Sequence, residues 1–377
     1  MQRRAFVRTG LAAALLAPAA SFPASAHALD LRTRRRSPAD PVRLSSNENP
    51  LGVPDSARAA IIDAIAQGHR YPRLNSDVRA RIAEVNGVAA ENVVLGNGSA
   101  EILQMTVQAM LVGGRNLRVI LPDPTFEQVE RYALAMGAVV EKVPLLPDHT
   151  HDIQRMRDAA ARSAGPVLAF ICNPNNPTGT VTSTEAVADW IRDAPPNMWF
   201  LVDEAYLEFV DHPAYRTMVS EAIARDNVVV SRTFSKIYGL AGIRLGYGIA
   251  TPDTIRRVDA FAAGTNINHL AGAAALACID DRDFIDRSLE VNRRGFQAAH
   301  ATLRDLNVEY LPSHANFIMH RVAGDLDTYI ARMRDAGVAV GRPFPPMLAY
   351  NRVSIGLPEE MEAWTKAITS LRGQGLV

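Results

Sequence analysis

The chain has 377 residues, of which 48% are hydrophobic and 21% are charged, and its 40 basic residues balance 40 acidic residues. This is the composition of a globular protein, far from the low-hydrophobicity, high-charge range of disordered chains. A zero net charge without a basic block in the body argues against a nucleic-acid-binding protein. Two cysteines are too few for a disulfide framework or a cysteine-rich metal site, and no apolar run is long enough for a membrane span in the mature protein.

The first 28 residues have the order of features that is typical of an export signal. Arg3 and Arg4 are followed by a mild apolar stretch from Leu11 to Ala20 and then by Ala-x-Ala cleavage patterns around Ala26. The apolar stretch is too short for a stable membrane span, and the paired arginines indicate the twin-arginine route. We therefore expect residues 1–28 to be a twin-arginine signal peptide and the mature protein to be periplasmic. The alternative is an alanine-rich tail with chance arginines.

The rest of the chain divides into an arm, a large domain and a small domain. We expect a linker and N-terminal arm over residues 29–50, a large domain over 51–265, and interdomain helices with a small C-terminal α+β domain over 266–377. In the large domain, short apolar runs alternate with helix-like segments, which predicts an α/β fold whose mostly parallel sheet is covered on both faces. The predicted strands are 93–95, 117–121, 139–143, 167–171, 200–202, 228–231 and 247–250. Thr182 and Glu185 are spaced as a capping box at the start of one helix.

Five polar segments stand where predicted strands end. They are Asn97–Glu101, Pro124–Phe126, Asn173–Gly179, Asp203–Tyr206 and Ser231–Lys236, and Gly242–Arg244 follows the last of them. Ligands of open α/β sheets bind at the carboxyl ends of the strands. The five segments therefore predict one shared site.

Lys236 and Asp203 are the candidate chemical groups of this site. Lys236 follows an apolar strand, and a lysine whose pKa is lowered by burial can form a Schiff base with an aldehyde cofactor, although a lone lysine is usually on the surface. Asp203 closes the strand Phe-Leu-Val-Asp. There its carboxylate could pair with a pyridinium nitrogen or cap a helix.

Other segments supply groups that suit a phosphate and a flat ring. The small residues Gly98–Ala100 open a helix, whose free N–H groups can bind a phosphate. Ser235 and Arg244 add a hydroxyl and a guanidinium. Phe126, near a helix start, could stack on a ring or belong to the core.

Together these segments resemble the class I and II aminotransferases, which are pyridoxal-phosphate-dependent enzymes of fold type I, with the closest likeness to the histidinol-phosphate aminotransferase branch. The resemblance covers about residues 41–377. Asn-Pro-Asn-Asn-Pro-Thr-Gly and Ser-Lys…Gly-Ile-Arg, in that order and spacing, are a strong joint signal. The resemblance implies that pyridoxal 5′-phosphate is bound by the large domain of a homodimer. The enzyme would move an amino group between an amino acid or related amine and a 2-oxo acid, by a ping-pong mechanism.

The resemblance also implies a role for each matched residue. Lys236 would carry the internal aldimine and move protons, Asp203 would pair with the pyridine nitrogen, and Tyr206 and Asn176 would hydrogen-bond the phenolic oxygen. Phe126 would stack on the ring. The phosphate would be bound by Ser99, Ala100, Thr233, Ser235, Arg244 and, from the neighbouring subunit, Tyr71. On the substrate side, Arg352 would bind a carboxylate, Arg342 a second anion, and Asn47 belongs to an arm that closes over the substrate.

Two departures from the family pattern limit what the resemblance implies. Phe126 stands where the family usually has tyrosine, which keeps the stacking but loses a hydroxyl contact. Histidine biosynthesis is cytoplasmic, so an exported enzyme does not suit it, and the likeness supports the reaction type better than the substrate. A fold-type I decarboxylase or lyase would keep the same lysine and aspartate, and a non-catalytic pyridoxal-phosphate-binding protein is the third alternative.

The histidines and cysteines carry no metal-site pattern. Only His149 and His151 are closely spaced, so we expect surface histidines and no metal site. Cys172 and Cys278 are expected to be free buried thiols, although an oxidising compartment would permit a disulfide bond.

Overall fold

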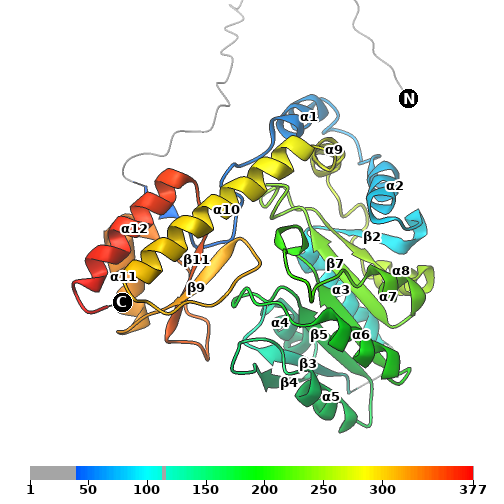
Figure 1. Ribbon diagram of the computed structural model, residues 1–377. Coiled ribbons are helices and arrows are strands. Elements are labelled where there is room, and N and C mark those ends of the chain that lie inside the picture. Colours follow the sequence, from blue (N-terminus) through cyan, green and yellow to red (C-terminus); the bar gives the residue numbers. More distant parts are fainter. Residues whose placement is uncertain (1–39, 113–115, 377) are drawn as a thin grey trace, which may run out of the picture. The chain divides into compact units, whose positions relative to one another are not determined.

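The computed structural model describes residues 40–112 and 116–376, so the predicted signal peptide lies outside the described residues. A large lobe is built on a seven-stranded sheet, and a small lobe holds two two-stranded sheets (Figure 1). Among the described residues, none of the helices is both long and apolar enough to cross a membrane.

The central sheet is mostly parallel. In sheet order its strands are β2 (Val93–Gly96), β8 (Gly246–Ile249), β7 (Val228–Thr233), β6 (Met198–Asp203), β5 (Val167–Cys172), β3 (Arg118–Asp123) and β4 (Val139–Pro144). Only β8 runs antiparallel to its neighbours, β2 and β7. This confirms the predicted α/β fold, and every predicted strand of the sheet is present with ends shifted by no more than two residues.

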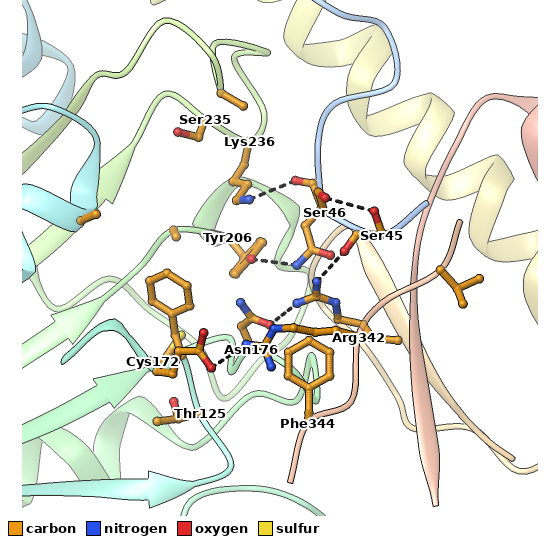
Figure 2. A pocket seen from close by; sticks show the side chains of 18 of the residues that line it. Ser45, Ser46, Thr125, Cys172, Asn176, Tyr206, Ser235, Lys236, Arg342 and Phe344 are labelled. Atoms are coloured by element: carbon orange, nitrogen blue, oxygen red, sulfur yellow. Dashed lines mark hydrogen bonds and ion pairs between the residues drawn. The ribbon is translucent and has the colours of Figure 1, made fainter. Parts of the chain in front are cut away.

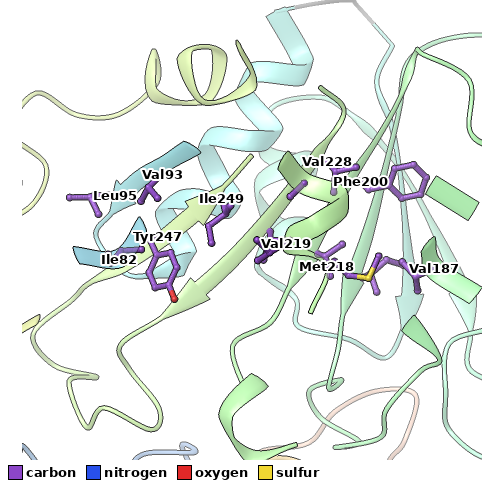
Figure 3. Close-up of a cluster of buried hydrophobic side chains, with 14 of the residues drawn as sticks. Ile82, Val93, Leu95, Val187, Phe200, Met218, Val219, Val228, Tyr247 and Ile249 are labelled. Atoms are coloured by element: carbon purple, nitrogen blue, oxygen red, sulfur yellow. The ribbon is translucent and has the colours of Figure 1, made fainter. Parts of the chain in front are cut away.

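Helices cover both faces of the sheet because alternate residues of each strand point to opposite sides. On one face, Val93, Phe200 and Val228 pack into a core with six helices (Figure 3). These helices are α1 (Asp55–Ile65), α2 (Asn75–Asn86), α5 (Ile153–Ala161), α6 (Thr184–Asp193), α7 (Val219–Ala224) and α9 (His269–Cys278). On the other face, Leu201 and Val229 pack with α3 (Ser99–Val112), α4 (Gln128–Ala135) and α8 (Pro252–Asp259). Burial on both faces explains the near-continuous apolar runs of the strands.

The small lobe contains the C-terminal part of the chain and one N-terminal strand. Its elements are β1 (Val42–Arg43), β10 (Val338–Ala339), β9 (Phe317–Arg321), β11 (Tyr350–Ser354), α10 (Arg282–Asp305), α11 (Leu326–Asp335) and α12 (Pro358–Arg372). Strand β1 pairs with β10, and β9 pairs with β11. The long helix α10 runs from near α9 to α12 and so connects the lobes (Figure 1). Short 3-10 turns occur at η1 (Ala90–Asn92) and η2 (Leu207–Phe209).

The predicted capping box at Thr182 is wrong by one residue. Helix α6 begins at Thr184, and the Ser183 side chain accepts the N–H of Ala186. The Thr182 N–H donates to Asn173 Oδ1 over 3.0 Å, and its hydroxyl accepts the N–H of His151 over 2.9 Å. These bonds keep Thr182 in the preceding loop, so the residue after it becomes the cap.

The expectation of surface histidines is wrong for His151 and His320. Both are buried, and burial lowers the pKa of each to about 4, so both rings are neutral at neutral pH. His320 lies on β9, where its ring nitrogens contact the Arg321 carbonyl and the Tyr329 hydroxyl.

Cys172 and Cys278 are free and buried, as predicted. Within the described part of the chain, no group of three His, Cys, Asp or Glu side chains could hold a metal ion.

Candidate active site

A cavity of about 920 Å³ lies at the carboxyl ends of β5, β6 and β7, next to the small lobe. Thirteen of the predicted site residues line it, and they are Asn47, Ser99, Ala100, Phe126, Asn176, Asp203, Tyr206, Thr233, Ser235, Lys236, Arg244, Arg342 and Arg352. Figure 2 shows Lys236, Tyr206 and Asn176 of the large lobe facing Phe344 and Arg342 of the small lobe. The edge of the sheet therefore brings together segments that are far apart in the sequence.

Lys236 is the lysine of this cavity. The sequence contains three lysines, and the side chains of the other two, Lys142 and Lys366, are 40% and 75% exposed and paired with acids. Lys236 Nζ donates to the Asn47 carbonyl over 3.1 Å and lies 5.6 Å from the centre of the Tyr206 ring. Burial, and then the charge of Arg352, lower the pKa of Lys236 to about 8. A larger fraction of this amine is therefore neutral and nucleophilic near neutral pH than of an ordinary lysine.

Asp203 and Tyr206 lie beside Lys236 at the end of β6. Burial raises the pKa of Asp203 to about 6, against the opposing effects of a hydrogen bond from Ser231 and the charge of Lys236. Asp203 is therefore mostly ionised at neutral pH. The Tyr206 hydroxyl accepts a hydrogen bond from Asn47 Nδ2 over 3.0 Å, and burial raises the pKa of this tyrosine.

The other end of the cavity fits a phosphate group. Arg244 Nη1 lies 3.3 Å from Ser235 Oγ, and its Nη2 donates to the Asn97 carbonyl over 3.1 Å. Gly98 has a φ of +79°, which favours glycine, and the Arg244 guanidinium occupies the space that a Cβ would need. Helix α3 begins next to it at Ser99, and its first N–H groups lack partners inside the helix.

These groups together fit a phosphorylated aldehyde cofactor that carries a ring nitrogen. The phosphate would lie at Arg244 and the start of α3, the aldehyde within reach of Lys236, and the ring nitrogen at Asp203. The donor set thus matches each end of pyridoxal phosphate.

The small lobe closes the cavity with Arg352. Its Nη1 donates to Asn176 Oδ1 over 2.6 Å and its Nη2 to the Ser45 carbonyl over 2.9 Å, whereas Nε has no hydrogen-bond partner among the described residues. The guanidinium lies 4.6 Å from the centre of the Phe344 ring. Burial lowers the pKa of Arg352 to about 10, so it remains a cation at neutral pH. A buried cation with an unpartnered N–H group suits a carboxylate.

Arg342, the second predicted anion-binding arginine, already has a carboxylate partner. Its Nη2 donates to Glu127 Oε2 over 2.6 Å, and its guanidinium lies 4.3 Å from the centre of the Phe344 ring. The Arg342 and Glu127 side chains are 52% and 42% exposed. The pair joins the large and small lobes at the rim of the cavity.

The arm, residues Ser45–Pro50, passes between the lobes. Asn47 has a φ of +53°, and Ser354 bonds both its N–H and its side-chain oxygen. Asn316 Nδ2 donates to the Asn47 carbonyl over 3.1 Å. Positive φ is uncommon outside glycine. The hydrogen bonds from Ser354 and Asn316 therefore hold Asn47 in an unfavourable backbone conformation, in which it contacts both Tyr206 and Lys236.

Tyr71 is the one predicted site residue that the structure does not bring to the cavity. Its side chain is 83% exposed and lines a separate polar pocket with Gln67, Arg70, Arg73 and His269. Its predicted function therefore depends on a second subunit.

Sequence reasoning missed four residues that complete the site. Ser231 belongs to the polar segment Ser231–Lys236, which the sequence indicated without giving Ser231 a role, and Glu127 directly follows the predicted Phe126. Phe344 and Asn316 lie in segments whose approach to the cavity has no local signature. Phe344 contacts the guanidinium groups of Arg342 and Arg352, and Asn316 hydrogen-bonds the Asn47 carbonyl of the arm.

Comparisons with known proteins agree on one family. The family model described as aminotransferase class I and II matches residues 39–368. The chain is 39% identical to histidinol-phosphate aminotransferase 2 of Ralstonia nicotianae, over 88% of this chain and 89% of the relative. It is 37% identical to histidinol-phosphate aminotransferase of Symbiobacterium thermophilum, over 89% and 92%.

A solved structure extends the agreement to the cofactor. Histidinol-phosphate aminotransferase of Sinorhizobium meliloti, in complex with pyridoxal-5′-phosphate, superposes with a TM-score of 0.81 at 26% identity, over 88% of this chain and 90% of that one. The family match, the fold and the fit of the cavity lead to one conclusion: this chain belongs to the class I and II aminotransferases and is a pyridoxal-phosphate-dependent enzyme that transfers amino groups.

Proposed function

We propose that Lys236 is the residue to which the cofactor is attached and that Arg352 binds the carboxylate shared by an amino-acid donor and a 2-oxo-acid acceptor. The observation that supports this most directly is the placement of Lys236. It alone of the three lysines lines the cavity, together with Asp203 and with Ser235 and Arg244 of the phosphate-binding end.

The chain's own residues supply binding and proton transfer. When bound, pyridoxal phosphate supplies an aldehyde that condenses with amines and a protonated ring that accepts electrons from the substrate's Cα–H bond. Asp203 would hold the proton on the ring nitrogen, and Asn176 and Tyr206, which line the same cavity, would hydrogen-bond the phenolic oxygen. Lys236 Nζ, in the cavity beside the Tyr206 ring, would take the proton from the substrate's Cα as a base and later donate a proton as an acid.

Arg352 gives both half-reactions the same anchor. An amino acid and its 2-oxo acid carry the same carboxylate, so a single guanidinium serves both directions of a ping-pong exchange. Arg352 also holds that carboxylate in place, whereas a decarboxylase expels it. The relatives' name makes histidinol phosphate a further candidate amine, but the proposed export from the cytoplasm argues against it.

We also propose that the working unit is a homodimer. Tyr71 is exposed and lies outside the cavity of its own subunit. Its proposed partner is the cofactor phosphate of the neighbouring subunit, and a twofold dimer, the commonest closed symmetry, would complete both sites at once.

Export is the remaining part of the proposal. The Arg3-Arg4 pair, the apolar stretch and the Ala-x-Ala pattern support a twin-arginine signal. Phosphate esters cross membranes poorly because a charge in hydrocarbon is costly, and folding around the cofactor before export would avoid that step. Arg3→Lys with Arg4→Lys should retain the precursor in the cytoplasm. Continued export of this double variant would point to the general secretory route.

An amino-acid screen tests the reaction and its substrate class. The holoenzyme is mixed with each amino acid in turn, without acceptor, and the absorption spectrum is followed. Conversion of the cofactor to its amine form with release of a 2-oxo acid is expected for the true donor. Release of carbon dioxide or ammonia would indicate the decarboxylase or lyase alternative.

A further inference from the structure

We propose that Ser231 is a positioning residue of this active site: its hydroxyl orients Asp203 and keeps it as a carboxylate, ready to hold the proton on the cofactor's ring nitrogen. The inference rests on the proposed role of Asp203 and adds the group that makes that role possible. Ser231 Oγ donates to Asp203 Oδ1 over 2.8 Å. Ser231 is 0% exposed and Asp203 2%, so water does not compete for this hydrogen bond.

The sheet register places Ser231 where it can act on Asp203. Cys172, Asp203 and Ser231 are paired side by side on β5, β6 and β7. Residues in register on parallel strands point to the same face, so Asp203 has one neighbour on each side. Cys172 directs its Sγ to the Pro174 carbonyl at 3.4 Å. Among the described side chains, Ser231 is the one that hydrogen-bonds to the Asp203 carboxylate.

This contact decides the orientation of the carboxylate. Asp203 lines the cavity; its Oδ1 accepts the Ser231 hydroxyl, and the Ala205 N–H is a second donor to the carboxylate. A carboxylate free to rotate between two rotamers would present either oxygen and would lose entropy on binding. The serine therefore prepares Asp203 before the cofactor arrives.

The same contact favours the charged form of a buried acid. Burial raises the pKa of Asp203 to about 6, and the charge of Glu204 acts in the same direction, while the Ser231 hydrogen bond and the charge of Lys236 oppose them. A hydrogen bond donated to a carboxylate stabilises the ionised form. Without it, the pKa of Asp203 would rise further, and a neutral aspartic acid cannot hold a proton on the ring nitrogen.

The experiment measures binding of pyridoxal phosphate to the full-length apoprotein as a function of pH. Ser231→Ala should weaken binding on the order of tenfold at pH 7, the loss expected for one hydrogen bond to a charged group. The loss of affinity that accompanies protonation of Asp203 at low pH, the acid limb of the profile, should also move to higher pH, because the pKa of Asp203 rises without the Ser231 hydrogen bond. Ser231→Thr keeps a hydroxyl and should have the wild-type affinity at pH 7 and the wild-type acid limb. Ser231→Cys has a weak donor of similar size, so its affinity and its acid limb should lie between those of the wild type and Ser231→Ala.

A matched control removes a different buried hydroxyl. Thr106 is buried in α3 and donates to the Ile102 carbonyl over 2.8 Å, so Thr106→Val loses a comparable contact away from Asp203. It should leave the acid limb unchanged. A Ser231→Ala protein that binds equally weakly at every pH and is not rescued by threonine would show a structural role only and overturn the inference.

Asp203→Asn separates this inference from the assignment on which it rests. If Asp203→Asn weakens binding while the alanine and cysteine variants of Ser231 behave as the wild type, the role of Ser231 is wrong and that of Asp203 stands. If Asp203→Asn binds pyridoxal phosphate as tightly as the wild type, the proposed role of Asp203 is wrong.

Discussion

At the scale of single residues, the site consists of charged groups whose protonation is set by burial. Lys236 and Asp203 have pKa values shifted toward each other, to about 8 and about 6, with burial as the main cause in both. Both groups therefore change protonation close to neutral pH. Shifts of this kind are what acid–base work on a substrate requires.

The lowered pKa of Lys236 predicts the pH dependence of cofactor attachment. Only the neutral amine attacks an aldehyde, so the attachment rate should rise with pH and level off above about 8, rather than near the ordinary value of about 10.4. The rate is measured by mixing apoprotein with pyridoxal phosphate and following the absorbance. Arg352→Gln removes a neighbouring positive charge and should move the midpoint to higher pH.

Lys236→Ala provides the control for this prediction. It should abolish covalent attachment and lower turnover by a factor on the order of 10³ or more. Lys142→Ala and Lys366→Ala, which change exposed lysines, should retain both. A borohydride-reduced cofactor found by mass spectrometry on Lys142 or Lys366 would contradict the assignment.

Glu127 is expected to disfavour substrates with an anionic side chain, because its carboxylate occupies Arg342. Its ion pair with Arg342 is exposed and contributes only about 0–1 kcal/mol, so a substrate anion can compete for the arginine. Glu127→Gln should raise kcat/KM for substrates with an acidic or phosphorylated side chain about fivefold, because the competing carboxylate is gone. Neutral amino acids should change little.

Two further variants test whether this effect is specific to charge. Arg342→Gln should lower kcat/KM for the same anionic substrates. Glu309→Gln, which removes an exposed ion pair with Arg321 in the small lobe, should be neutral for all of them. Equal changes for neutral and anionic substrates in Glu127→Gln would disprove a role in selectivity.

At the scale of elements, a buried ion pair fixes the ends of β6 and β7. Arg232 Nε and Nη2 donate to Glu204 Oε2 over 3.0 and 2.8 Å, and Glu204 Oε1 accepts the Met218 N–H over 2.7 Å. Arg232 also bonds the Asn86 side chain of α2. Because Glu204 follows Asp203 and Arg232 follows Ser231, this pair fixes the two strand ends that carry the proposed ring-nitrogen contact.

Breaking this pair should destabilise the fold. Glu204→Ala leaves the Arg232 charge buried without its partner, which should cost about 3–5 kcal/mol of unfolding free energy. The double variant Glu204→Leu with Arg232→Met should lose less, since the Arg232 charge is removed together with that of Glu204. Urea unfolding followed by circular dichroism measures both, and Lys366→Ala, at an exposed pair, should be within about 0.5 kcal/mol of the wild type. A double variant less stable than Glu204→Ala would contradict this account.

At the scale of the whole molecule, the cavity is assembled from three parts of the chain. The large lobe contributes Lys236, the small lobe Arg352, and the arm Asn47, which contacts both lobes. No single part contains the lysine, the substrate arginine and the arm. A proposed fourth part, Tyr71, comes from the second subunit.

Hybrid dimers test that fourth contribution. Lys236→Ala and Tyr71→Phe protomers are each expected to be impaired, because each lacks one residue of every site. After mixing and subunit exchange, one site of each hybrid combines an intact Lys236 with an intact Tyr71. Random pairing should then restore about a quarter of the wild-type sites, measured as turnover above the sum of the separate variants. A monomer with full activity, detected by sedimentation, would refute the dimer.

The local sequence was sufficient to predict the strands of the sheet and most of the residues that line the cavity. Strand runs such as Val228–Ser231 are apolar because both faces of the sheet are buried, and this pattern can be recognised within a few residues. The polar segments at strand ends likewise indicated Lys236, Asp203 and Arg244, since the topology of an open α/β sheet brings these ends to one edge. The cap of α6 was misplaced because Thr182 is held in the loop by a hydrogen bond that its N–H donates to Asn173 and one that its hydroxyl accepts from His151.

Only the tertiary structure shows which of these side chains are in contact with one another. Asn176 and Arg352 are 176 positions apart, and Glu127 and Arg342 are 215 apart, yet both pairs are in hydrogen-bond contact. The burial of His151 and the hydrogen bond from Ser231 to Asp203 also depend on neighbours from other strands and loops. Periodicity and motifs predict only the local structure of the segment that contains a residue. Contacts between distant segments, and the pKa shifts they cause, exist only after the lobes have packed.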